Sequence, residues 1–246
     1  MPSTDETSSG DHGTAGPVKQ LAFVVYPGLT PLDIIGPLQV LSAVPRIDPS
    51  FEVVVAGEAL DVLPTDAVVK LAPSHTFDDV PDPFGIVVPG GEGPTLDAAG
   101  NRRLLDYVRA SAVTAEFVMS VCTGAIILAA AGLLRGRNAT THWAYADLVE
   151  GLGATYVRQR WVEEGKILTT AGVSAGIDGA LHIASRLVGV DMARVIQLGI
   201  EYDPEPPFGP IDWAPDTLDA LRPLWRGTWE EEVAKRPYLD GRPARS

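Results

Sequence analysis

Residues 115–134, AEFVMSVCTGAIILAAAGLL, decide the fold, because a strand-like sequence runs directly into a helix-like one. The part 117–121 is a short apolar run with two valines, which is typical of a buried strand. The second half is rich in alanine and leucine and predicts a buried helix that ends near Gly132. Cys122, the one cysteine of the chain, lies between them. We expect a sharp strand-to-helix turn with this cysteine at the bend.

A cysteine at such a bend is well placed to act as a nucleophile. It projects beyond the C-terminal end of the strand, next to the free N–H groups of the helix. Because these groups and the helix dipole favour an anion, we expect the pKa of the Cys122 thiol to lie below its ordinary value of about 8.5. The alternative is a buried structural cysteine, since free cysteine is among the most buried residue types.

Asp33 is a second candidate for the site. Residues 20–26, QLAFVVY, predict a buried strand, and residues 29–41 predict a helix opened by Pro31. Asp33 then lies in the first turn of that helix, just past a strand end, where the sites of open α/β sheets collect. The alternative is a carboxylate that satisfies the N–H groups at the helix start.

A glycine-rich loop, PGGEGP at 89–94, follows another predicted strand at 84–88. Paired glycines let the backbone approach a ligand and present N–H groups to it. The loop matches neither of the common phosphate-binding patterns, GxxxxGK[ST] and GxGxxG. It is interpreted either as an oxyanion-type donor loop or as a tight turn.

Strands alternate with helices along the rest of the chain, which predicts an α/β fold with a mostly parallel sheet between helices. Further strands are expected at 51–56, at 137–140 and as an antiparallel pair within 154–170, with one short edge strand within 62–71. Residues 1–18 are interpreted as a disordered tail, 19–204 as the α/β domain and 205–246 as a C-terminal arm. One helix is expected at 217–235, with Trp225 and Trp229 packed on the body.

The composition bounds the function. With 246 residues, 46% of them hydrophobic, the chain can build one sizeable core. A formal net charge of −13 argues against nucleic acid or an anionic membrane as a partner. One cysteine permits no intrachain disulfide and favours a reducing compartment, so we expect a cytoplasmic protein. The histidines are scattered and there is no CxxC, so we expect no metal site.

Several motifs now point to one family: LDIIGPLQVL (32–41), VVPGGEG (87–93), SVCTGAIILAAAGLL (120–134), RNATTHWAYADL (137–148), TTAGVSAGID (169–178) and QLGIEYDPEPPF (197–208). They resemble isonitrile hydratases, a branch of the superfamily of PfpI-type proteases and class I glutamine amidotransferase-like domains. The resemblance runs from about residue 21 to 208. It implies a flavodoxin-like fold with a nucleophile elbow, hydration of an isonitrile to an N-substituted formamide, no cofactor, and a homodimer.

The resemblance also implies roles for single residues. The family's nucleophile falls on Cys122 and its general acid/base on Asp33, while Thr123 and the backbone near Gly91 and Val173 fall on substrate-binding positions. Protease and glutaminase relatives place a histidine beside or near the cysteine. Here Thr123 stands beside it and cannot act as a base near pH 7. His142 is the remaining candidate for a remote partner, with capping or packing as its alternative role.

The expected chemistry is attack by the Cys122 thiolate, a covalent thioimidate, and hydrolysis, with Asp33 moving the protons. Two like charges about 4 Å apart repel by roughly 4 kcal/mol at an effective dielectric of about 20. Asp33 and Cys122 are therefore expected to share one proton near neutral pH. The alternatives are a glyoxalase-like enzyme or amidase on the same cysteine, and a thiol redox or ligand sensor without catalysis.

Overall fold

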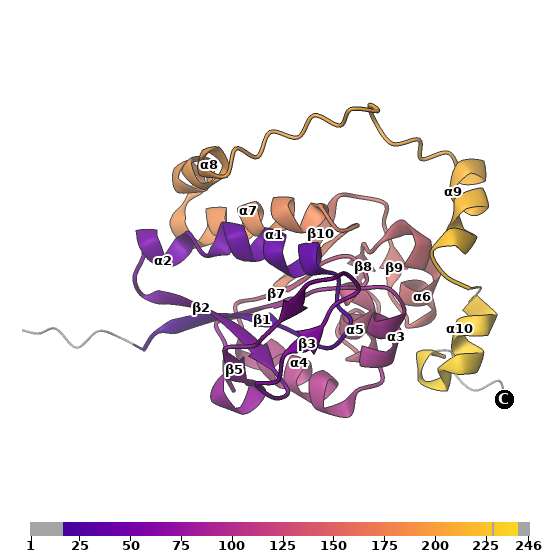
Figure 1. Ribbon diagram of the computed structural model, residues 1–246, viewed down its shortest axis with the longest axis horizontal. Coiled ribbons are helices and arrows are strands. Elements are labelled where there is room, and N and C mark those ends of the chain that lie inside the picture. Colours follow the sequence, from indigo (N-terminus) through magenta and orange to yellow (C-terminus); the bar gives the residue numbers. More distant parts are fainter. Residues whose placement is uncertain (1–16, 228, 241–246) are drawn as a thin grey trace, which may run out of the picture.

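A seven-stranded sheet forms the centre of the protein in the computed structural model, which describes residues 17–227 and 229–240 (Figure 1). Across the sheet the strands follow the order β10–β11–β7–β6–β1–β2–β5. All neighbours pair in parallel except β10, which is antiparallel to β11. The bounds are β1 Lys19–Val24, β2 Phe51–Gly57, β5 His75–Thr76, β6 Gly85–Val88, β7 Phe117–Ser120, β10 Trp161–Glu164 and β11 Ile167–Thr170.

Helices cover both faces of this sheet (Figure 1). One face carries α1, α2 and α7, with α8 packed on α7, and the other carries α3, α4 and α5, with α6 beside α5. The bounds are α1 Pro31–Leu41, α2 Val44–Ile47, α3 Gly93–Ala98, α4 Arg102–Thr114, α5 Gly124–Ala130, α6 Ala146–Gly151, α7 Ala175–Val188 and α8 Val190–Gly199. None of the helices in the described ranges is long and apolar enough to cross a membrane. The predicted α/β fold with a mostly parallel sheet is confirmed.

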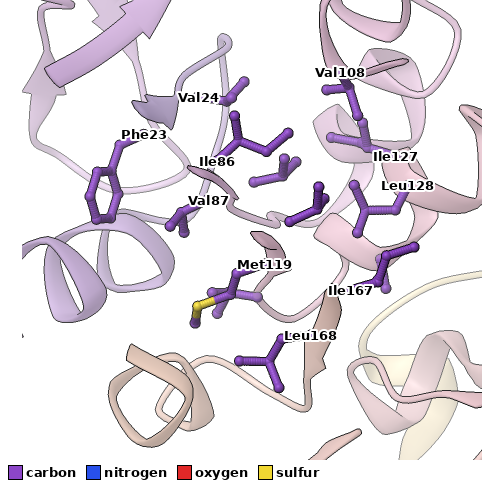
Figure 2. Close-up of a cluster of buried hydrophobic side chains, with 14 of the residues drawn as sticks. Phe23, Val24, Ile86, Val87, Val108, Met119, Ile127, Leu128, Ile167 and Leu168 are labelled. Atoms are coloured by element: carbon purple, nitrogen blue, oxygen red, sulfur yellow. The ribbon is translucent and has the colours of Figure 1, made fainter. Parts of the chain in front are cut away.

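The core is built from the alternation of strand side chains between the two faces of the sheet. Phe23, Val87, Met119 and Leu168 are register partners in adjacent strands and lie together on the side of α7, as Figure 2 shows. The residues next to them in the strands, such as Ile86, point to the opposite side, where helices α4 and α5 supply their packing partners. This two-sided burial explains why the central strands read as continuous apolar runs.

Some connections differ from the sequence-based expectation. Within 62–71 there are two short strands, β3 Leu63–Pro64 and β4 Lys70–Leu71, which pair with each other and not with the main sheet. The strand at one edge of the sheet, next to β2, is β5, which was missed. The expected strand at 137–140 is β8 Asn138–Ala139, and its partner β9 Thr155–Tyr156 was also missed. These pairings involve two residues per strand, too few for a periodic pattern.

The C-terminal arm corrects another expectation. In place of one helix over 217–235 there are two, α9 Pro215–Leu221 and α10 Trp229–Lys235, with a single 3₁₀ turn, η3 Arg222–Leu224, between them. Pro223 explains the break, because proline lacks the N–H that a continuing helix needs. The Trp225 ring packs 5.2 Å from that of His142, as expected, whereas the Trp229 side chain and the tail 1–16 lie outside the described residues.

The arm reaches the body through an exposed strap and then docks. Residues 203–216 are all exposed, and Figure 1 shows this segment arching from α8 to α9. Beyond it, Arg236 forms an ion pair with Asp97 at 2.7 Å, and the Tyr238 hydroxyl donates to the Leu96 carbonyl at 2.9 Å. The end of the arm is therefore fastened to α3, the helix that follows the glycine-rich loop.

Candidate active site

Cys122 stands at the sharp turn between β7 and α5, where the sequence predicted it. Its φ of 57° lies in the left-handed region, which non-glycine residues seldom adopt and which costs roughly 1–2 kcal/mol. The Cys122 N–H donates to the Ala171 carbonyl at 2.8 Å, and the Cys122 carbonyl accepts from Thr141 Oγ1 at 2.9 Å. A Cβ on Gly124 would lie 2.2 Å from the Val88 carbonyl oxygen, so this position requires glycine. The strained turn is held by the segments around it.

Asp33 is buried directly behind the glycine-rich loop. Its side chain is 0% exposed, and Oδ2 accepts a hydrogen bond from the Gly90 N–H at 2.9 Å. This bond goes to another segment and not to the start of its own helix, which favours a site role over helix capping. Within the described part of the chain, Oδ1 has no hydrogen-bond partner. A Cβ on Gly90 would lie 2.8 Å from Oδ2 and 2.5 Å from the Thr123 nitrogen, so glycine is needed here too.

Burial dominates the titration of this pair. It raises the pKa of Asp33 from 3.8 to about 7, although the Gly90 N–H and the neighbouring Cys122 oppose the shift. Burial also raises the pKa of the Cys122 thiol well above its ordinary value, and the negative charge of Asp33 adds to that shift. Each group affects the pKa of the other, so the thiol and the carboxyl lie within interaction range.

The expectation that the Cys122 pKa falls below its ordinary value is therefore wrong for the resting site. The N–H and side chain of Thr123 do favour the thiolate, as predicted for groups at a helix start. However, α5 has only seven residues and the thiol is 5% exposed, so desolvation outweighs these groups. With Asp33 titrating at about 7 and the thiol above it, the pair retains one proton just above neutral pH.

The glycine-rich loop positions the site with its backbone. The Gly91 N–H donates to Thr123 Oγ1 at 2.9 Å, and the Thr123 hydroxyl donates to the Gly91 carbonyl. The Gly90 N–H is already bonded to Asp33. Both amides are thus committed to protein groups, so the suggestion that this loop offers them as oxyanion donors is not supported. What the loop does is hold Asp33 and Thr123 in place through these hydrogen bonds.

The thiol opens into a pocket of about 140 Å³. The pocket brings together Cys122, Thr123, Gly91 and Val173 with the remote candidate His142. Asp33 lies behind this lining, next to the sulfur. The sequence reasoning missed the other lining residues, which are Thr30, Asp66, Glu92, Tyr145 and Trp225.

His142 enters the pocket as a neutral ring. It is 9% exposed, and burial lowers its pKa from 6.5 to about 4. Its Nδ1 accepts a hydrogen bond from the Ala144 N–H at 3.3 Å, which places the ring proton on Nε2. This contact caps the 3₁₀ turn η2 Trp143–Tyr145, one of the two alternatives left open by the sequence. A neutral imidazole of this kind is a hydrogen-bond donor to the pocket and a poor base.

Tyr26 is a buried residue of the site that the sequence reasoning passed over. Its hydroxyl donates to the Pro89 carbonyl at 2.9 Å and shares a hydrogen bond of 2.8 Å with Thr95. Its pKa is raised well above 10 by burial and by the nearby Asp33 and Cys122. The strand-end rule that identified Asp33 applies equally to Tyr26, which follows β1, so this residue could have been found.

A metal centre finds no support in the described residues. No group of three or more His, Cys, Asp or Glu side chains within them is arranged to hold an ion. The acidic residues Asp66 and Glu92 lie at the exposed mouth of the pocket, apart from each other in sequence and each on its own loop.

A cysteine at a sharp strand-to-helix turn of a parallel sheet, with a buried carboxyl beside the thiol, defines a class of α/β protein. Residues 19–186 match the model of the DJ-1/PfpI family, and the chain belongs to this family. The chain is 42% identical to the isonitrile hydratase of Pseudomonas putida over 203 residues. This match covers 81% of this chain and 86% of that protein. The predicted family resemblance is confirmed.

Solved structures of other proteins have the same fold. A THiJ/PfpI family protein from Pseudomonas syringae is similar over 98% of this chain and 96% of its own, with 31% identity and a TM-score of 0.78. Drosophila melanogaster DJ-1beta is similar over 76% of this chain and 100% of its own, with a TM-score of 0.68. At 21% identity the second likeness shows the fold alone.

Proposed function

We propose that this protein is an isonitrile hydratase in which Cys122 attacks the substrate and Asp33 moves the proton. The main support is the buried pair itself: a thiol at the elbow in contact with a carboxyl whose pKa is raised to about 7. The 42% identity to the Pseudomonas putida enzyme supports the choice of substrate. Catalysis by a free thiol also suits the reducing cytoplasm, where we expect the enzyme to work.

The first step forms a covalent intermediate. The Cys122 thiol gives its proton to the Asp33 carboxylate as the sulfur bonds to the terminal carbon of R–N≡C, and that carbon takes up the proton, giving the thioimidate R–N=CH–S–Cys. Once bonded to sulfur, the carbon comes within reach of the carboxyl that contacts the same sulfur. Asp33, which now carries the proton of the thiol, can therefore donate it to the carbon, and a pKa of about 7 lets this carboxyl both accept and release a proton near neutral pH.

The second step consumes water. Water adds to the thioimidate carbon, the substrate nitrogen gains a proton, and the C–S bond breaks to give R–NH–CHO and the free thiol. Asp33, now ionised, passes one proton of the water to the nitrogen and the other to the departing sulfur, and so ends ionised as it began. Every atom of the product comes from the isonitrile and one water molecule, so the sequence of steps balances with no oxidant or reductant.

The electrostatics of the pocket favour an uncharged substrate such as an isonitrile. Asp66 and Glu92 line its mouth, Asp33 lies behind it, and His142 is neutral at pH 7. A substrate bearing a carboxylate near its reactive carbon would be repelled by these groups.

Product analysis tests the proposal. Wild-type protein is incubated with alkyl and aryl isonitriles, and the N-substituted formamide is measured by mass spectrometry while the isonitrile band is followed by infrared absorption. We expect formamide in amounts far above protein, and none with Cys122→Ser. Turnover of methylglyoxal or of a simple amide, with no formamide from any isonitrile, would instead establish one of the other two activities. Light scattering tests the expected homodimer separately.

A further inference from the structure

A second and larger cavity, of about 650 Å³, adjoins the Cys122 pocket. His142, Val173 and Trp225 line both cavities, so the two meet at these residues. One wall of the larger cavity belongs to the α/β body and the other to the C-terminal arm between residues 211 and 225. We call this cavity the arm chamber.

The walls of the arm chamber are mainly apolar. From the arm come Ile211, Trp213, Leu218, Leu221 and Trp225, and from the body come Leu32, Trp143, Tyr156 and Val173. Trp213 and Trp225 are 39% and 45% exposed, so each indole keeps a free face that a ligand can contact. Aromatic and branched side chains with free faces are the usual lining of a site for a hydrophobic group.

The charged groups of the arm chamber are already engaged. Arg158 donates to the Trp213 carbonyl at 2.9 Å, and Arg160 pairs with Asp178 at 2.6 Å. Asp212 accepts hydrogen bonds from the Ala214 N–H and from the Thr217 hydroxyl, which fixes the start of α9. These groups hold the wall in place and leave the apolar surface for a ligand.

The arm is docked by a buried cation, so the arm chamber is a built feature. The Arg226 side chain is 2% exposed, its Nε donates to the Ala144 carbonyl at 2.6 Å, and it forms an ion pair with Asp147. The Tyr145 hydroxyl donates to the Trp225 carbonyl at 3.3 Å. These bonds fasten the arm to the segment that carries His142, at the junction of the two cavities.

Size explains why the arm chamber is needed. The Cys122 pocket, at about 140 Å³, has room for the –N≡C group and a few further atoms. Sites for larger organic ligands usually enclose about 300–1,000 Å³, a range that includes the arm chamber and excludes the small pocket. A substrate whose reactive carbon touches the thiol must therefore extend its substituent past His142 and Trp225.

We infer that the arm chamber binds the substituent of the isonitrile and selects for a bulky, uncharged hydrocarbon group, aromatic or alicyclic. This inference rests on the proposed function, which supplies the reactive end. The arm lies outside residues 19–186, the part that matches the family model. Substrate choice is thus assigned to a segment added to the catalytic domain.

Matched variants on the arm test the inference. Leu218→Trp fills the arm chamber, and Leu221→Ala enlarges it. Leu224→Ala is the control, because Leu224 lies on the same arm, is 78% exposed and does not line the cavity. Rates of hydration are compared for methyl isonitrile and 2-naphthyl isonitrile. We expect Leu218→Trp to lower kcat/KM for the naphthyl substrate at least tenfold, mainly through KM, and Leu221→Ala to change it severalfold. All three variants should leave the methyl substrate within about twofold of wild type.

Two outcomes overturn the inference: equal losses for both substrates, or naphthyl kinetics that none of the variants alters. If wild-type protein hydrates neither substrate, the proposed function fails, and the arm chamber is then judged by binding alone. N-(2-naphthyl)formamide is titrated into wild type, Leu218→Trp and Leu224→Ala by calorimetry. At least tenfold weaker binding in Leu218→Trp alone supports the arm chamber as a ligand site, and equal binding, or no binding to wild type, refutes it.

Discussion

The chemistry of the site depends on two side chains that burial forces to compete for a proton. Cys122 and Asp33 both have raised pKa values, and each contributes to the shift of the other. Neither value could be obtained from the sequence, which indicated the helix start but not the depth of burial. The predictions at this scale concern the thiol, the carboxyl and the pH dependence that their coupling produces.

Replacing Cys122 with alanine should abolish turnover of isonitriles and leave the fold intact. The thiol makes the covalent bond in the proposed mechanism, whereas the Cys122 main chain is held by the Ala171 carbonyl and the Thr141 hydroxyl. Activity is measured by formamide production and folding by circular dichroism. A variant that retains more than a few per cent of the wild-type rate would rule out covalent catalysis through this thiol.

Replacing Asp33 with asparagine should lower kcat by about 10²–10⁴-fold, the usual contribution of a general acid/base. Asparagine keeps the shape and the acceptor for the Gly90 N–H but has no proton to transfer. The same change should lower the apparent pKa of the thiol, because a neighbouring negative charge is removed. Thiolate absorbance in the ultraviolet follows the titration, and an unchanged kcat together with an unshifted titration would reduce Asp33 to a structural role.

Asp33 should also make stability depend on pH in an unusual direction. The folded state keeps the Asp33 proton up to about pH 7, while the unfolded chain releases it near 3.8. Between these values the folded state binds more protons, so this group's contribution to stability falls as the pH rises. We expect Asp33→Asn to be more stable than wild type at pH 8, by up to about 4 kcal/mol for the shift of roughly three pKa units, and to lose that advantage at pH 4. Urea unfolding at both pH values measures the difference, and equal differences at both would refute the raised pKa.

At the scale of the element, the sequence predicted the helices and strands that are long and have a regular pattern of apolar residues. The strand-to-helix turn at Cys122 and the strand-end position of Asp33 were both predicted, because they follow from apolar runs and from the edge rule for parallel sheets. The pairs β3–β4 and β8–β9 were missed or misplaced, since two-residue pairings leave no pattern. Trp225 reaches the Cys122 pocket through the docking of the arm, a long-range contact whose exact position no local sequence signal records.

The start of α5 offers a test of how tightly these elements meet. In Gly124→Ala, the added Cβ would lie 2.2 Å from the Val88 carbonyl oxygen, a backbone atom that cannot easily move. We expect the free energy of unfolding to fall by about 1–3 kcal/mol. The turn at Cys122 should also be distorted, so that little activity remains. Gly199→Ala is the matched control, because a Cβ at the end of α8 meets no atom within 4 Å. Similar urea midpoints for the two variants would contradict the close packing described here.

At the scale of the whole molecule, two parts with different tasks are joined by one exposed strap. The α/β body carries the thiol and the carboxyl, and the arm closes the site from outside. The arm was predicted to exist, and Trp225 and Trp229 were predicted to pack on the body; the structure describes this packing for Trp225. Its two helices and its buried arginine were not, because Arg226 is an ordinary charged residue until the arm has docked.

Replacing Arg226 with alanine should loosen the arm without unfolding the body. The change removes the hydrogen bond to the Ala144 carbonyl and the ion pair with Asp147, whose side chain is 36% exposed and can regain water. We therefore expect faster hydrogen exchange and faster proteolysis within 215–227, with the thermal unfolding of the α/β body little changed. Arg222→Ala provides the control, because that side chain is 31% exposed and lies 3.9 Å from the same carboxylate. If both variants exchange like wild type, Arg226 does not anchor the arm.

The exposed strap at 203–216 has a consequence for how this protein can evolve. The part of the strap before the arm chamber, residues 203–210, contributes no strand to the sheet, no side chain to the buried core and no wall to the arm chamber, so substitutions and insertions there face little selection for folding. The arm beyond it can change its sequence while the body keeps the strained turn and the carboxyl. One wall of the substrate cavity is therefore encoded apart from the stretches that fold the body, and a lineage can vary that wall without trading away the stability on which its chemistry depends.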